Sequence, residues 1–261
     1  MHASRHSRPG VILLALVCLL AGGSCRREPD ATLVAAAISL RHSLLDLGEA
    51  YEERNPHAAV RFHFAASGVL LQQALQGAPF DVILFAGEEE MDRLEDGGAL
   101  APSTRLAFAS NRMVIAVPRG GAEPGSLEDL REPRYQRIAL GSSATVPAGR
   151  YAAQALRNSG LWHDLEPRLV LTIDAGQAVE YVERNEVDAA FLYASDAVEY
   201  PWLTVALEVD PALHDPIRYT AAMLREPPDP DGATRFLELL EGNLAEVVLR
   251  RHGFRAERVA P

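Results

Sequence analysis

Apolar residues from position 32 onward alternate between strand-like runs and helix-like faces. Thr32–Ile38 is a short apolar run typical of a buried strand. Helical spacing follows, with apolar side chains at Leu40, Leu44, Leu47 and Tyr51. The same alternation predicts further strands at Val60–Phe64, Asp81–Ala86, Arg112–Val117, Ile138–Leu140, Leu169–Ile173 and Ala189–Tyr193.

Strands that alternate with helices favour α/β sheets in which neighbouring strands are parallel and the crossovers are right-handed. About nine strands in a chain of 261 residues fit two small sheets better than one large sheet. The C-terminal part is expected to be helical from about Asp231 to Arg251, with Gly253 as its stop signal.

Residues 1–24 have the pattern of an export signal. Arg5 and Arg8 give a positive start to the chain, and Val11–Leu20 is continuously apolar. Small residues follow at 21–24, and Cys25 directly after them resembles the lipid-attachment cysteine of bacterial lipoproteins. We therefore expect a periplasmic or extracytoplasmic protein, with Cys25 lipidated and residues 25–30 as a lipid-anchor tether. The alternative is ordinary signal cleavage near Ser24, which leaves Cys25 as a free thiol.

The charge balance excludes several classes of function. Arginine and lysine together number 25, against 36 aspartate and glutamate residues, so the net charge is −11. A nucleic-acid-binding protein needs a basic excess to neutralise phosphates, and this sequence has none. It also has no lysine, which excludes the phosphate-loop and Schiff-base lysines. Motifs of zinc proteases, serine hydrolases and dinucleotide-binding enzymes are absent, so neither catalysis nor a cofactor is expected.

Small residues recur where a predicted strand gives way to a helix. These junctions contain Ser39, Ser67-Gly68, Val146–Gly149 and Asp174–Gly176. In open α/β sheets such junctions lie at the carboxyl ends of the strands, where ligands bind. Helix N-termini at these places present unpaired N–H donors and a partial positive charge, which suits an anion without any cationic side chain. The alternative is that both serines serve only as helix N-caps.

Several short motifs occur in an order and spacing that resemble one known family. They are Ala35–Leu40, Phe64–Gly68, Gly77–Asp81, Val146–Tyr151, Val182–Glu186, Tyr193–Ala197 and Arg251–Phe254. With these motifs the chain resembles the periplasmic molybdate-binding proteins of ABC transporters, which are type II periplasmic binding proteins. The resemblance covers nearly all of the sequence that follows the export signal, and Val146–Tyr151 is its most specific motif.

The resemblance implies an α/β fold of two lobes, each a mostly parallel sheet flanked by helices, with the ligand in the cleft between them. It implies lobe 1 at 31–108 together with 212–261, and lobe 2 at 109–211. It further implies that Ser39 and Ser67 donate hydrogen bonds to the ligand from side chain and backbone. Ala148 and Ala175 would donate backbone N–H groups, and Tyr193 its phenol O–H.

The function that the resemblance implies is capture of a tetrahedral oxyanion, molybdate or tungstate, by a monomer that delivers it to the permease and ATPase subunits of an ABC transporter. The oxyanion is the only metal expected, held by the same five residues. Three alternatives stay open: the same fold with sulfate or an organic anion as ligand, a sensory lipoprotein that feeds no transporter, and a secreted hydrolase. The hydrolase is disfavoured because the sequence shows no set of nucleophile, base and orienting residue.

Overall fold

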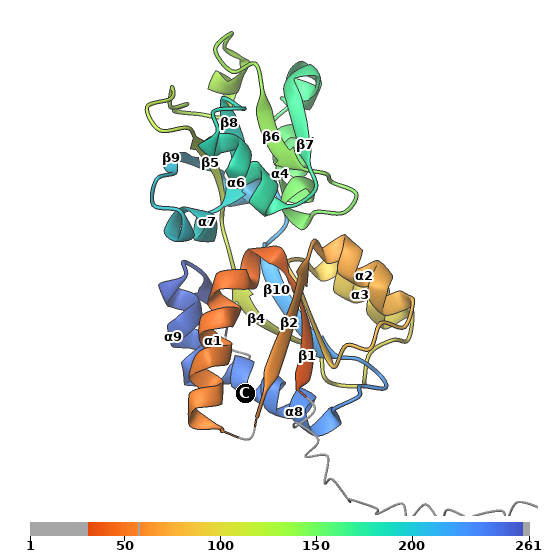
Figure 1. Ribbon diagram of the computed structural model, residues 1–261. Coiled ribbons are helices and arrows are strands. Elements are labelled where there is room, and N and C mark those ends of the chain that lie inside the picture. The colour runs from red at the N-terminus through yellow and green to blue at the C-terminus, as the bar shows by residue number, and fades with distance from the viewer. Residues whose placement is uncertain (1–30, 57, 258–261) are drawn as a thin grey trace, which may run out of the picture.

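A computed structural model describes residues 31–56 and 58–257, so the predicted export signal, Cys25 and the tether lie outside the described residues. Two sheets, each with helices on both faces, form two lobes that lie one above the other in Figure 1. The chain passes from the first sheet to the second after Ser110 and returns after Glu208. The exact lobe boundaries at 108/109 and 211/212 stay a prediction.

The first lobe contains the strands β1 (Thr32–Ala37), β2 (Val60–Ala65), β3 (Val82–Phe85), β4 (Leu106–Ser110), β10 (Arg218–Met223) and β11 (Arg255–Ala256). Its helices are α1 (Arg41–Arg54), α2 (Ser67–Leu75), α3 (Glu88–Asp96), α8 (Pro230–Glu241) and α9 (Asn243–Arg251). The second lobe contains β5 (Met113–Val117), β6 (Ile138–Gly141), β7 (Leu169–Thr172), β8 (Ala189–Tyr193) and β9 (Thr204–Glu208). Its helices are α4 (Pro147–Asn158), α5 (Trp162–Leu165), α6 (Ala175–Glu183) and α7 (Ala194–Glu199).

Each sheet joins a parallel part to antiparallel strands, so the predicted two-lobed α/β class is confirmed and the sheets are mixed. In the first sheet, of order β11-β4-β10-β3-β1-β2, β1 pairs in parallel with β2 and β3, while β10 runs antiparallel to β3 and β4. In the second, of order β7-β6-β8-β5-β9, β6 is parallel to β7 and β8, and β5 is antiparallel to β8 and β9. The strands β4, β5, β9 and β10 flank the two crossings between the lobes. Of these, β10 and β5 run against the parallel strands of their sheets, whereas β4 and β9 run in the same direction as the parallel strands.

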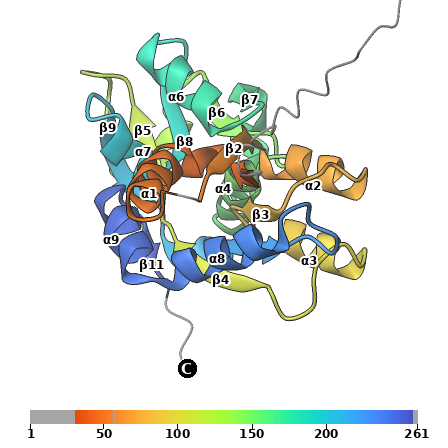
Figure 2. The same ribbon diagram turned by 60° about the horizontal axis from the view of Figure 1, so that its bottom comes forward.

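The core follows from the two-residue period of buried strands, which places alternate side chains on opposite faces of a sheet. In β1, Val34 and Ala36 pack toward α1, α8 and α9, whereas Ala35 packs toward α2 and α3. Figure 2 shows these two groups of helices on opposite sides of the first sheet. The second lobe repeats this arrangement, with α4 on one face and α6 on the other. The inner parallel strands β1, β3, β6 and β8 are therefore buried on both faces, while the edge strands β2 and β7 are partly exposed. The helices that follow the carboxyl ends of the parallel strands have their N-termini toward the neighbouring lobe.

The C-terminal segment is helical as predicted, but it is interrupted at Gly242. The residue adopts an extended conformation with φ −82° and ψ 162°, which ends α8 and provides the N-cap position of α9. Glycine is poorly suited to a helix interior because it has much backbone entropy to lose. The predicted stop is confirmed, since Gly253 follows α9 with a φ of +82° that favours glycine.

Candidate functional site

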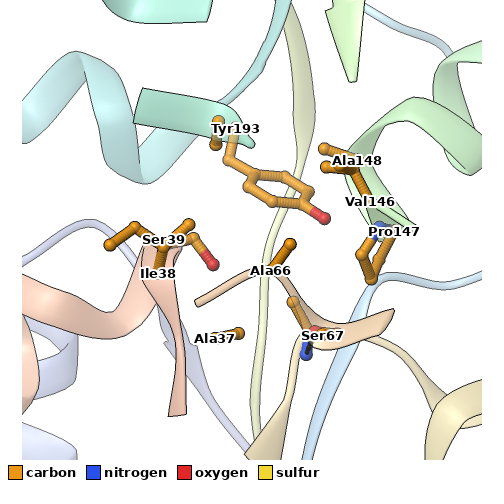
Figure 3. A pocket seen from close by; sticks show the side chains of 11 residues that line it. Ala37, Ile38, Ser39, Ala66, Ser67, Val146, Pro147, Ala148 and Tyr193 are labelled. Atoms are coloured by element: carbon orange, nitrogen blue, oxygen red, sulfur yellow. Dashed lines mark hydrogen bonds between the residues drawn. The ribbon is translucent and has the colours of Figure 1, made fainter. Parts of the chain in front are cut away.

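All five residues predicted to bind the ligand line one pocket between the two lobes. Ser39 and Ser67 reach it from the first lobe, and Ala148 and Tyr193 from the second (Figure 3). Ala175 of the second lobe lines it as well. The remaining lining residues are Ala37, Ile38, Ala66, Ala86, Val146 and Pro147. The structure therefore brings together predicted site residues as far apart in sequence as Ser39 and Tyr193. Their role as ligands stays a prediction.

The pocket is small. It accommodates the centres of water-sized spheres over a volume of about 20 Å³. A water molecule needs about 10–15 Å³ by this measure, and a sphere of 20 Å³ has a radius of about 1.7 Å. The four oxygens of a tetrahedral oxyanion lie one bond length from the central atom, so their centres fit a space of this size.

The Tyr193 hydroxyl is the most informative group in this pocket. Tyr193 ends β8, is 1% exposed, and its Oη has no hydrogen-bond partner among the described residues. Figure 3 shows this hydroxyl pointing into the pocket, toward the side of Ser67 and Ala148. Burial raises the pKa of Tyr193 well above its usual value, so the phenol stays protonated and can donate. A buried unpaired polar group costs about 1–3 kcal/mol, which a ligand oxygen in the pocket would offset.

Three helices begin at the pocket, and each contributes a backbone N–H without an intrahelical acceptor. Ser67 is the first residue of α2, Ala148 the second of α4, and Ala175 the first of α6. The Ser67 Oγ accepts a hydrogen bond from the Ala86 N–H at 3.1 Å, which leaves its own hydrogen free to donate. The fourth junction is the 3₁₀ turn Ile38–Leu40, which carries Ser39 at its centre. The site is thus a set of hydrogen-bond donors.

The sequence Val146–Gly149 explains how α4 comes so close to β6. A Cβ on Gly149 would lie 1.8 Å from the carbonyl oxygen of Gly141, and a Cβ on Gly141 would lie 2.5 Å from the Val146 Cγ1. Only glycine fits at either position. Pro147 suits the first turn of α4 because it has no N–H to leave unpaired. This packing fixes the N-terminus of α4, with the Ala148 N–H, at the end of the strand.

Two contacts join the lobes beside the pocket. The Gly68 N–H of α2 donates to the carbonyl oxygen of Thr145 at 3.0 Å. The guanidinium of Arg150 in α4 donates two 2.8 Å hydrogen bonds to the carboxylate of Glu90 in α3, and Glu89 lies 3.0 Å from its Nε. No sequence pattern indicates these contacts, since the run of glutamates that contains Glu90 has the composition of a solvated helix face. The cation nearest in sequence to Ala148 is therefore engaged by carboxylates.

The electrostatics of the pocket are those of dipoles. None of the lining side chains carries a charge at neutral pH. Behind Tyr193, the Asp196 Oδ2 accepts the Tyr193 N–H at 2.9 Å, and burial, with a smaller contribution from Glu199, raises the pKa of Asp196 to about 7. Within 31–56 and 58–257, no group of histidine, cysteine, aspartate and glutamate side chains is arranged to hold a metal ion. No helix in that same part is long and apolar enough to span a membrane.

The match between this chain and a family model defines its class. The model for bacterial extracellular solute-binding proteins matches residues 32–255, and the chain belongs to that family. Among its relatives is YvgL of Bacillus subtilis (strain 168), provisionally named an ABC transporter substrate-binding lipoprotein, with 31% identity over 94% of both chains. The molybdate-binding protein ModA of Escherichia coli (strain K12) is 30% identical over 92% of this chain and 94% of its own. The periplasmic molybdate-binding protein of Azotobacter vinelandii shares the fold, with a TM-score of 0.77, 22% identity, and coverage of 88% of this chain and 99% of that structure.

Proposed function

We propose that this protein captures one tetrahedral oxyanion, molybdate or tungstate, between its lobes and delivers it to an ABC transporter. The observation that carries the proposal is the buried, unpartnered hydroxyl of Tyr193, which points into a small pocket lined by donors. Membership of the solute-binding family and the similarity to ModA support it.

The donors suit a fully deprotonated dianion. Hydrogen bonds to a charged acceptor contribute about 1.5–3 kcal/mol each, more than bonds between neutral groups. Water-excluding closure strengthens these interactions because it lowers the local dielectric constant. Hydrogen phosphate carries a proton that needs an acceptor, and in this pocket that proton would face another donor. Molybdate, tungstate and sulfate have no such proton at neutral pH, so they are the ligands to compare.

Capture follows from the two lobes and the crossings between them. The Gly68–Thr145 hydrogen bond and the Arg150–Glu90 ion pair join the lobes next to the pocket. We infer that the lobes open by hinge bending at the two crossings, release the anion to the permease, and close again around the next one. A lipid at Cys25, with residues 25–30 as tether, would keep this monomer near the membrane. This function needs no cofactor and no bond cleavage.

Calorimetric titration with molybdate, tungstate, sulfate and phosphate tests the proposal. We expect molybdate and tungstate to bind tightly, and phosphate to bind far more weakly. At a hundred times its dissociation constant, a bound ligand stabilises the folded protein by about 2.7 kcal/mol, so a thermal shift confirms the result independently. Affinity is expected to change little between low and moderate salt, since no cationic side chain lines the pocket. Sulfate bound more tightly than molybdate would replace the proposed ligand, and no binding of any of the four anions would overturn the proposal.

Delivery to a transporter has its own test. A bacterial strain that lacks this gene is expected to take up less molybdate at low external concentration, and expression of the intact gene to restore uptake. Unchanged uptake in a strain whose purified protein binds molybdate would favour the sensory alternative.

A further inference from the structure

Asn111 lies in the first crossing between the lobes, outside the pocket, and its amide contacts both lobes. Its Nδ2 donates to the Ser195 Oγ of α7 at 2.9 Å and to the Tyr219 Oη of β10 at 3.3 Å. Its Oδ1 accepts the backbone N–H of Arg112 at 2.9 Å. Asn111 is 9% exposed, Ser195 1% and Tyr219 0%, so this small network is buried.

The Arg112 N–H determines the orientation of the amide. A backbone N–H only donates, so the atom of Asn111 that faces it must be the oxygen. The amide nitrogen therefore faces the two hydroxyls, and it can only donate to them. As a result, the Tyr219 Oη must accept on the side of Asn111.

This orientation sets the direction of the next hydrogen bond. The Tyr219 Oη lies 3.2 Å from the Ser39 Oγ, and by geometry alone either oxygen could donate. Because the Tyr219 hydroxyl already accepts from Asn111, its single hydrogen is available for Ser39. Among the described residues Ser39 and Asn111 are the hydrogen-bond partners of the Tyr219 Oη, and the Asn111 Nδ2 only donates, so the buried hydrogen of Tyr219 has Ser39 as its acceptor. The hydrogen of Ser39 is then left for the pocket that it lines. The direction of donation therefore runs from Asn111 through Tyr219 to Ser39.

We propose that Asn111 is a positioning residue that makes Ser39 a donor toward the bound anion and so contributes to the selection of fully deprotonated oxyanions. This inference rests on the proposed function, since it assumes an oxyanion in the pocket. Asn111 touches no ligand itself, and it acts through the Tyr219 hydroxyl. Asn111 determines which oxygen donates in the hydrogen bond between Tyr219 and Ser39. A substitution can therefore reverse this donation while the contact between the two hydroxyls is kept.

Asn111→Asp reverses the direction of donation along the hydrogen bonds from residue 111 through Tyr219 to Ser39, with almost no change in the shape of the side chain. The carboxylate still accepts the Arg112 N–H, but it has no hydrogen to give to Ser195 or Tyr219. Tyr219 then donates to the aspartate and accepts from Ser39, so a lone pair of Ser39 faces the anion. The substitution also adds a negative charge near the site. Combining it with Tyr219→Phe isolates the effect of this charge, because the double variant keeps the aspartate but lacks the hydroxyl that links residue 111 to Ser39.

The test is titration of wild type, N111D, Y219F and the double variant with molybdate and with phosphate at pH 8. We expect N111D to weaken molybdate binding at least tenfold and to lower the ratio of molybdate affinity to phosphate affinity by a similar factor. In the Y219F background, N111D is expected to leave that ratio unchanged, because without the Tyr219 hydroxyl no hydrogen bonds connect residue 111 to Ser39. Urea unfolding of each protein reports on folding.

The outcomes separate the two proposals. Failure of wild type to bind any tetrahedral oxyanion overturns the proposed function, and this inference with it. Molybdate binding by wild type together with an unchanged affinity ratio in N111D, or the same change of ratio in both backgrounds, overturns this inference alone. Should N111D fail to fold, Y219F decides: we expect it to lower the affinity ratio, and wild-type affinity and ratio in Y219F would overturn the inference.

Discussion

The Tyr193 hydroxyl offers a test in which affinity and stability respond differently. Tyr193→Phe removes one buried oxygen that has no hydrogen-bond partner among the described residues. The ring contact with Tyr219, with centroids 6.1 Å apart, is kept. In the complex, the variant lacks a hydrogen bond to a charged oxygen, which is worth about 1.5–3 kcal/mol. We therefore expect the dissociation constant for molybdate to rise about 10- to 150-fold.

The ligand-free variant is expected to be at least as stable as wild type, because an unpaired buried hydroxyl costs about 1–3 kcal/mol. Titration calorimetry gives the affinity, and urea unfolding without ligand gives the free energy of unfolding. Tyr135→Phe is a matched control: Tyr135 is also 1% exposed, but its hydroxyl donates to the Ala122 carbonyl oxygen at 3.1 Å. The control should lose about 1 kcal/mol of stability and keep its affinity.

Two results would refute this reasoning. Unchanged molybdate affinity in Tyr193→Phe would remove the phenol from the site. A ligand-free Tyr193→Phe that is less stable than wild type by as much as the Tyr135→Phe control would show that the Tyr193 hydroxyl has a partner within the folded protein.

Three further substitutions test other parts of the account. Gly68→Ala places a Cβ 2.8 Å from backbone atoms of Thr145 in the other lobe. We therefore expect at least tenfold weaker molybdate binding at an unchanged free energy of unfolding. Equal affinity would show that closure of the lobes does not need this close approach. Ser67→Ala is expected to weaken binding by about 1–3 kcal/mol, and also to lower stability because the Ala86 N–H loses its acceptor, as measured by calorimetry and urea unfolding. Asp196 has a pKa of about 7 in the folded protein against 3.8 ordinarily, so the folded state holds its proton more tightly and wild type loses stability as pH rises from 4 to 7. Asp196→Asn is expected to gain stability relative to wild type between pH 4 and pH 7, at about 1.4 kcal/mol for each pKa unit of the shift, and a pH-independent difference would contradict this.

The candidate site was largely predictable because its members occupy short motifs with a local signature. Ser39, Ser67, Ala148 and Ala175 each stand where a strand gives way to a helix, and the carboxyl ends of parallel strands meet at one edge of a sheet. Tyr193, which ends a predicted strand, was added by resemblance to a family. The pattern of apolar residues also located the inner parallel strands β1, β3, β6 and β8, since these are buried on both faces.

Other features depend on contacts that leave no local pattern. The partnership of Tyr219 with Asn111 joins residues 108 positions apart, on a strand that the apolar pattern did not reveal. Burial of Glu90 requires Arg150 of the other lobe as its partner. Gly242 looks like a tolerated helix residue until its extended conformation is known. In each case the determining interaction is tertiary.

The central claim is that neutral donors of both lobes surround one tetrahedral anion. A crystal structure with molybdate, in which anomalous scattering locates the molybdenum, tests it most directly. The account predicts one molybdate in the pocket, with its oxygens within hydrogen-bond distance of the Tyr193 Oη, the Ser67 Oγ and the Ala148 N–H. Molybdate bound elsewhere, or held by the guanidinium of an arginine, would contradict it.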